Sequence, residues 1–172
     1  ENGAGKSTLM KILAGVQAAD EGTFFLEGKT VRIDSVRAAM AVGIALIHQE
    51  LNLAENLEIA ANIFLGRELR RFGLLDDETM REEAAKYLAM VGLEVDAAME
   101  VGMLPIGKQQ LVEIAKALSV DAQVLIMDEP TSSLSQTEAE QLFVVIKDLV
   151  SRGVSIIYIS HRLSEIGQIA DR

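Results

Sequence analysis

The sequence predicts an α/β fold: a mainly parallel sheet flanked by helices, with an inserted helical region. Three short apolar segments, Ile44–Ile47, Val124–Met127 and Ser155–Ile159, have the length and composition of buried strands. Amphipathic helical stretches separate them, which is the alternation typical of parallel sheets. The stretch 50–110 has no comparable apolar strand, so we interpret it as a helical insertion. The 172 residues are enough for one domain with a core.

Helical periodicity and turn residues predict the other elements. In Asp76–Val91 the apolar residues lie on one helical stripe, and the acidic residues at its start suit the helix dipole. The remaining elements, in order, are a helix over Lys6–Leu13, a hairpin in Gly22–Val31 around Glu27-Gly28, a short helix capped by Asp34 or Ser35 and running to Met40, and helices near Leu57–Leu65, Lys108–Leu118 and Gln136–Val150.

Composition excludes several classes of function. The 16 basic and 26 acidic residues give a net charge of −10, which argues against a general nucleic-acid binder. There are no cysteines, so disulfide scaffolds and thiolate chemistry are excluded. No apolar run approaches the roughly 20 residues of a membrane-spanning helix. The chain begins at Glu1 without a signal peptide or an initiating methionine, and we expect an internal piece of a cytosolic protein.

The first segment that indicates chemistry is Asn2–Thr8, Asn-Gly-Ala-Gly-Lys-Ser-Thr. Glycines allow backbone N–H groups to turn toward phosphate oxygens, a lysine reaches the terminal phosphates, and a hydroxyl binds Mg²⁺. Gly5, Lys6 and Ser7 supply these groups in that order, just before a helix whose N-terminus favours an anion. The alternative is a glycine-rich turn that merely precedes a helix.

The second segment is Val124–Glu129, in which four apolar residues lead into two carboxylates. Ligands of α/β sheets bind at the carboxyl ends of the strands. Asp128 can therefore hold Mg²⁺, and Glu129 is placed to polarise an attacking water. Taken alone, the pair fits an acidic turn that caps a strand better than a catalytic site, but an upstream phosphate loop favours the catalytic interpretation.

Besides the two segments above, the chain contains the motifs Gln49, Gly107-Lys-Gln-Gln, Met127-Asp-Glu-Pro-Thr-Ser and Ser160-His161-Arg162. The order of these motifs along the chain resembles that of the nucleotide-binding subunit of ABC transporters, a P-loop NTPase. Three longer segments are similar to the bacterial importers of ribose, galactose and xylose-type sugars: His48–Leu51, Asn62–Glu68 and Gln110–Leu118. The resemblance spans nearly the whole chain.

The resemblance implies a role for each matching residue. Asn2, Gly3, Ala4, Gly5, Lys6, Ser7 and Thr8 would bind the phosphates of ATP; Ser7, Gln49 and Asp128 would hold Mg²⁺; and Glu129, His161 and Gln49 would serve catalysis. Glu129 would be the base, His161 would contact the γ-phosphate, and Gln49 would sense that phosphate and the metal. Without the resemblance, a lone glutamine is more often a solvated loop residue, and a lone histidine after a strand is more often structural.

Two positions depart from the family pattern. The segment Leu104–Lys108 stands where the family has Leu-Ser-x-Gly-Gln, which faces the phosphate loop of a second nucleotide-binding domain. Pro105 offers neither a hydroxyl nor a backbone donor there. Gly107 and the helix that follows could still offer backbone N–H groups. Ser135 replaces the more common aspartate, a change that sugar importers tolerate.

The resemblance implies an ATPase that energises monosaccharide import. We expect a single partial ABC domain, with 1–49 and 119–172 as the nucleotide-binding core and about 50–118 as the helical subdomain, truncated at both ends and first of two in its parent. Its partners would be a second nucleotide-binding domain, a membrane permease at the cytoplasmic face and, indirectly, a sugar-binding protein, with no nucleic acid. The alternatives are a soluble ABC-type ATPase acting on nucleic acid or ribosomes, and a non-catalytic fragment.

Overall fold

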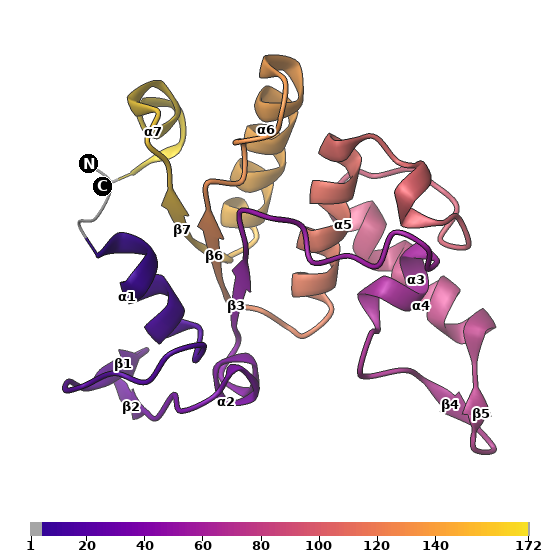
Figure 1. Cartoon of the computed structure of the whole chain (residues 1–172), viewed down its shortest axis with the longest axis horizontal. Coiled ribbons are helices and arrows are strands. Elements are labelled where there is room, and N and C mark those ends of the chain that lie inside the picture. The colour runs from indigo at the N-terminus through magenta and orange to yellow at the C-terminus, as the bar shows by residue number, and fades with distance from the viewer. Residues whose placement is uncertain (1–4, 172) are drawn as a thin grey trace.

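Three parallel strands form the central sheet of the computed structural model, which describes residues 5–171. β3 (Ile44–Ile47), β6 (Val124–Asp128) and β7 (Ser155–Ile159) lie in the order β3–β6–β7. β6 pairs with both of its neighbours in parallel, without a break in either register, and Figure 1 shows all three strands pointing the same way. The three predicted strands and their parallel arrangement are therefore confirmed.

Side chains of the sheet alternate between two apolar layers. Leu125 and Met127 of β6 are fully buried in the larger apolar cluster, on one face of the sheet, whereas Ile126 is fully buried in the smaller cluster on the other face. A strand buried on both faces needs an unbroken apolar run, which explains the composition of β6. The helices α5 (Ile106–Leu118) and α6 (Gln136–Ser151) contribute to the larger cluster, and α1 (Lys6–Leu13) and α2 (Val36–Ala41) contribute to the smaller one.

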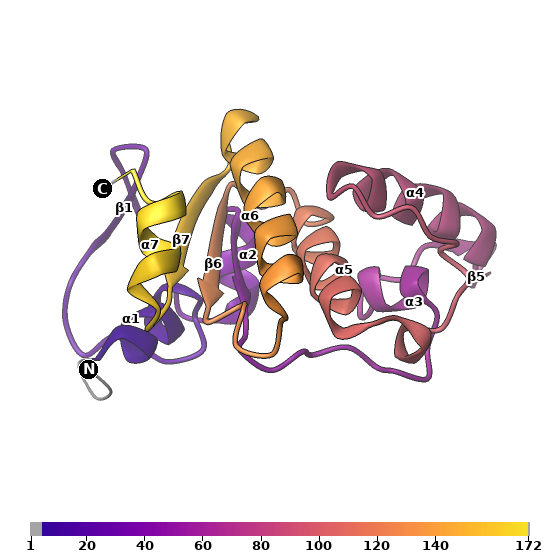
Figure 2. The same cartoon turned by 90° about the horizontal axis from the view of Figure 1, so that it is seen from above.

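The region between β3 and β6 is mainly helical, as predicted, and extends to one side of the sheet (Figures 1 and 2). Buried Ile59, Ile63 and Leu88 pack there in the same cluster as the inner face of α5. Its other elements are α3 (Ile59–Ile63), α4 (Asp77–Met90), the short strands β4 (Arg70–Arg71) and β5 (Leu74–Leu75), and the 3₁₀ turn η1 (Val101–Met103).

Local signals set most element ends. Ser35, not Asp34, caps α2 by accepting a hydrogen bond from the Ala38 amide at 3.2 Å. The β1–β2 hairpin (Phe24–Leu26 with Lys29–Val31) turns through two residues of positive φ, the conformation that two-residue hairpin loops prefer. Both features were predicted from the turn and cap residues.

Two helices differ by two residues from their predicted bounds, and four elements were not predicted. α5 begins at Ile106, two residues early, because Pro105 occupies the N-cap. α3 is shorter than Leu57–Leu65 because Glu58 stays extended and pairs with Glu100 in an isolated bridge. The sequence did not predict β4–β5, η1 or α7 (Leu163–Ile169). β4 and β5 have two residues each and are exposed, so they carry no alternation of apolar and polar residues.

Candidate functional site

The N-terminal end of α1 is the described part of the predicted phosphate loop; Asn2, Gly3 and Ala4 lie outside the described residues. Gly5 is the N-cap, with φ 81°, a left-handed conformation that glycine adopts without steric cost. The next three residues are exposed in the first turn, which contains no acidic residue, and no described side chain caps it. The N–H groups in the first turn of a helix favour an anion.

The other predicted residues follow the ends of the parallel strands. Asp128 ends β6 and is followed by Glu129; His161 comes two residues after β7 ends, and Gln49 comes two residues after β3 ends. The strands pair in parallel, so these residues leave the sheet at one edge. Asp128 and Glu129 are half-buried there, whereas Gln49 and His161 are exposed.

Glu129 and His161 are in direct contact. The His161 Nδ1 atom lies 3.1 Å from the Glu129 Oε2 atom, and their side chains are 60% and 25% exposed, respectively. Glu129 has φ 50°, in the left-handed region, while its amide donates to the Ile159 carbonyl at 2.9 Å. Such a backbone costs about 1 kcal/mol or more for a residue with a side chain, and it is common at functional sites. A carboxylate that faces a histidine at an open edge can accept a proton from water.

Gln49 borders a cavity of about 340 Å³ together with the loop that follows Glu129 and the start of α5. Ser132 and Ser133 line it from the loop, and Ile106 lines it from the helix. The structure therefore brings Gln49 to the β6–α6 loop and to the Gly107 segment. It records no contact between Gln49 and Glu129 among the described residues.

Gly107 has a partner that the sequence did not predict. Its amide donates to the Glu138 Oε1 atom at 3.2 Å, and a Cβ atom there would lie 2.5 Å from that oxygen. Glu138 also accepts from the Ser135 hydroxyl at 2.7 Å and forms a capping box with it. The Ser135 hydroxyl and amide, and then the Gly107 amide, hold the pKa of Glu138 below its ordinary value despite the effect of burial. The Gly107 amide is therefore already bonded in this conformation.

The segment after Gln49 is held by polar side chains that sequence reasoning missed. Glu113 of α5 accepts from the Asn52 amide at 2.8 Å, and Lys116 donates to the Asn52 carbonyl at 3.2 Å. Asn62 is fully buried and bonds both the amide and the carbonyl of Ala54. The only available signal was a polar residue placed among apolar neighbours on each helix.

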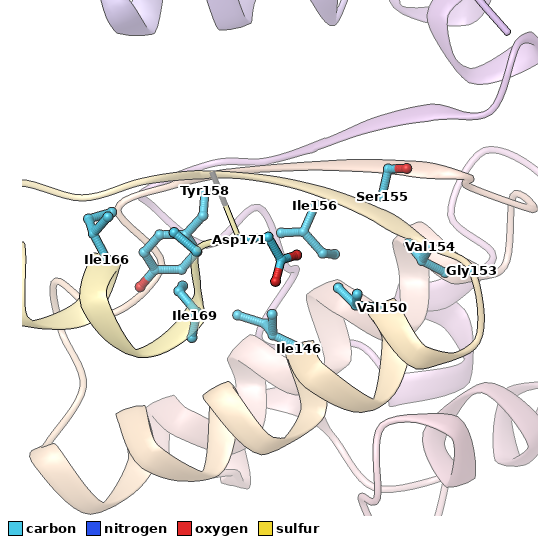
Figure 3. Close-up of a pocket in the computed structure, with 11 residues that line it drawn as sticks. Ile146, Val150, Gly153, Val154, Ser155, Ile156, Tyr158, Ile166, Ile169 and Asp171 are labelled. Carbon is cyan, nitrogen blue, oxygen red and sulfur yellow. The ribbon is translucent and has the colours of Figure 1, made fainter.

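A larger cavity, of about 660 Å³, lies elsewhere, between α6, β7 and α7. Figure 3 shows the Asp171 carboxylate directed into it, near Ile146 and Ile156. None of the predicted site residues lines this cavity.

Within residues 5–171, no three His, Asp or Glu side chains gather as a metal site. None of the helices in that range is both long and apolar enough to span a membrane.

Comparison with known proteins identifies the family. The sequence pattern of the family described as ABC transporter matches residues 1–132. The chain belongs to the ABC transporter family. Two solved ABC transporter structures share its fold. A nucleotide-free ATP-binding cassette has a TM-score of 0.86 and 25% sequence identity, and the match covers 99% of this chain and 72% of that chain. An ATP-binding cassette in its ADP conformation has a TM-score of 0.83 and 27% identity, and the match covers 98% of this chain and 70% of that chain. They confirm the predicted fold class.

Curated relatives of this ABC transporter chain carry sugar-import names. A ribose/galactose/methyl galactoside import ATP-binding protein of Burkholderia cenocepacia is 56% identical over 172 residues, which are 100% of this chain and 34% of that protein. The ribose import ATP-binding protein of Chromobacterium violaceum is 52% identical over 173 residues, with the same shares covered. The chain thus spans about a third of the length of these relatives.

Proposed function

We propose that this chain is the nucleotide-binding part of an ATPase that energises import of a monosaccharide through an ABC transporter permease. The observation that carries the proposal is the contact of Glu129 with His161 at the carboxyl edge of the sheet, 3.1 Å apart, where two of the three predicted catalytic residues meet. The sugar class rests on the printed names of relatives that are 52% to 56% identical to the whole chain.

The residues of this edge fit Mg-ATP. The exposed first turn of α1 offers Lys6, the Ser7 and Thr8 hydroxyls and backbone N–H groups to the phosphates, and that turn contains no acidic residue. Ser7, Gln49 and Asp128 offer oxygen atoms, the ligands that Mg²⁺ prefers. When bound, Mg²⁺ would neutralise charge on the β- and γ-phosphates.

Glu129 acts as the base in this proposal. Its carboxylate accepts a proton from the attacking water, and His161 beside it contacts the γ-phosphate and fixes the direction of the carboxylate. The left-handed backbone at Glu129 and its amide bond to Ile159 aim the side chain toward His161 before substrate arrives. Such preorganisation avoids reorganisation at the moment of reaction.

The larger assembly is part of the same proposal. The Gly107 segment of one nucleotide-binding domain faces the phosphate loop of a second, which the rest of the parent protein supplies. Residues 1–49 and 119–172 make the nucleotide-binding core, and residues 50–118 make the helical subdomain that contacts the permease at the cytoplasmic face of the membrane. A separate sugar-binding protein delivers the substrate to the permease.

The test is Glu129→Gln in the full-length protein, with the permease present. We expect ATP hydrolysis to fall by at least about 100-fold because the base is lost, while ATP binding stays unchanged. Glu140→Gln is the matched control, because Glu140 is exposed on α6 and, among residues 5–171, accepts a hydrogen bond only from Gln136. Hydrolysis by Glu129→Gln at the rate of the control would refute the assignment of the base.

A further inference from the structure

A buried carboxylate lies beside the proposed site. Glu165 of α7 is 5% exposed, unlike most glutamates of this acidic chain. A buried carboxylate is costly unless hydrogen-bond donors surround it. Three of the four donors around Glu165 come from the two loops that carry the proposed catalytic residues, and the fourth comes from β7.

Four side chains donate to the two oxygens of Glu165. The Thr131 hydroxyl at 2.8 Å and the Arg162 guanidinium at 3.3 Å reach Oε1. The Ser160 hydroxyl at 2.6 Å and the Tyr158 hydroxyl at 3.0 Å reach Oε2. Two donors on each oxygen match the acceptor capacity of an ionised carboxylate.

The positions of these donors connect the two loops. Ser160 and Arg162 flank His161 in sequence, and the Arg162 amide donates back to the Ser160 hydroxyl at 3.0 Å. Thr131 is 2% exposed and lies two residues after Glu129 in the β6–α6 loop. One carboxylate thus holds both neighbours of His161 and the loop of Glu129.

The charge state of the network suits this arrangement. Burial raises the pKa of Glu165, but the hydrogen bonds from Ser160, Thr131 and Tyr158 and the charge of Arg162 outweigh it, so the pKa lies below its ordinary value. Burial raises the pKa of Tyr158, so its hydroxyl remains a donor. Figure 3 shows the Tyr158 ring extending from β7 toward α7.

We propose that Glu165 is a positioning residue for ATP hydrolysis, which keeps the loop of His161 against the loop of Glu129. It touches neither residue and acts through Ser160, Arg162 and Thr131. A displacement of about 1 Å in a reacting group can cost about 100-fold in rate, so release of this link affects turnover more than nucleotide binding. The inference rests on the proposed function.

The first experiment is Glu165→Gln in the full-length protein. The amide keeps the shape but turns one acceptor atom into a donor, which then faces two existing donors. We expect kcat for ATP hydrolysis to fall at least about tenfold, with the ATP dissociation constant within about twofold of wild type. Glu140→Gln again serves as the control of equal charge. Wild-type kcat, or an equal loss of binding and turnover, would overturn the proposal.

A pair of Thr131 variants decides the question even if Glu165→Gln does not fold. Thr131→Ser keeps the hydroxyl and loses the methyl, whereas Thr131→Val keeps the shape and loses the hydroxyl. We expect Thr131→Ser to retain kcat and Thr131→Val to lose it. The opposite order would mean that Thr131 only packs, and it would contradict the proposal.

A double-mutant cycle with His161→Ala separates positioning from general damage. If Glu165 acts through His161, Glu165→Gln lowers the residual hydrolysis of His161→Ala by less than about twofold. A further tenfold loss would refute the inference. Unchanged hydrolysis in both Glu129→Gln and His161→Ala would instead refute the proposed function. If those two variants lose hydrolysis while Glu165→Gln does not, the positioning role alone fails.

Discussion

Replacement of Asn62 by alanine should release the segment that follows Gln49. The Asn62 side chain accepts from the Ala54 amide at 2.7 Å and donates to the Ala54, Leu57 and Glu58 carbonyls at 3.0, 3.3 and 3.1 Å. The three carbonyls also accept from backbone amides, but no other partner of the Ala54 amide is recorded in the described chain. The alanine variant therefore leaves the Ala54 amide without a hydrogen-bond partner. It also removes one of the two hydrogen bonds that each of the three carbonyls accepts.

The magnitude follows from these bonds. A donor left without a partner costs about 1–3 kcal/mol, and each second bond contributes near the lower end of about 0.5–1.5 kcal/mol. Since the Ala54 amide is only half-buried, we expect local opening to become easier by about 2–4 kcal/mol. That free energy raises the local opening constant by one and a half to three orders of magnitude, about tenfold for each 1.4 kcal/mol.

Hydrogen–deuterium exchange of the full-length protein measures this opening directly. We expect the Ala54 amide to exchange faster in Asn62→Ala by that factor, while amides of β6 keep their wild-type rates. Asn62→Asp keeps the acceptor for the Ala54 amide but turns a carboxylate toward three carbonyls, so it should open at least as easily at neutral pH. Less than about a threefold change in Asn62→Ala would refute the anchoring role of this side chain.

Three further predictions concern caps and the Gly107 segment. The folded state lowers the pKa of Glu138, chiefly through the Ser135 hydroxyl, so its stabilising effect is present above the ordinary value of 4.5 and is lost as pH falls through the folded pKa. Thermal melting of Glu138→Gln should therefore lie below wild type at neutral pH and converge with it in acid. Ser35→Ala should destabilise α2 by about 1 kcal/mol, measurable as faster amide exchange in its first turn. Pro105→Ser should raise ATP turnover in the full-length protein by supplying a hydroxyl, and an unchanged rate would mean that backbone donors suffice.

Elements with strong local signals could be predicted from the sequence. The predicted bounds of β3 and β7 match the structure, and β6 and α6 each extend one residue further. Each is defined by an apolar run or an amphipathic period that does not depend on distant residues. α7 was missed because its seven residues contain one buried side chain, and that side chain is the glutamate Glu165.

The candidate site could be predicted in part for the same reason. Glu129 and His161 each follow an apolar strand, so their arrival at one edge follows from a parallel sheet. Their contact, and the bond between Gly107 and Glu138, depend on how distant segments pack. Glu113 illustrates the limit: its partner Asn52 lies 61 positions away, and nothing near either residue in the sequence indicates the pair.

Three buried or half-buried carboxylates of this acidic chain link segments that are distant in the sequence. Glu113 of α5, Glu138 of α6 and Glu165 of α7 each accept hydrogen bonds from a segment adjacent to a proposed site residue. An ionised carboxylate has two acceptor oxygens and no donor of its own, so it can bind N–H or O–H groups of two segments without leaving a polar hydrogen unsatisfied. Glu138 joins the starts of α5 and α6 in this way, and Glu165 joins the loops that follow β6 and β7. Some of the carboxylates that contribute to the net charge of −10 therefore accept hydrogen bonds within the molecule, and these are not surface charges available to a partner.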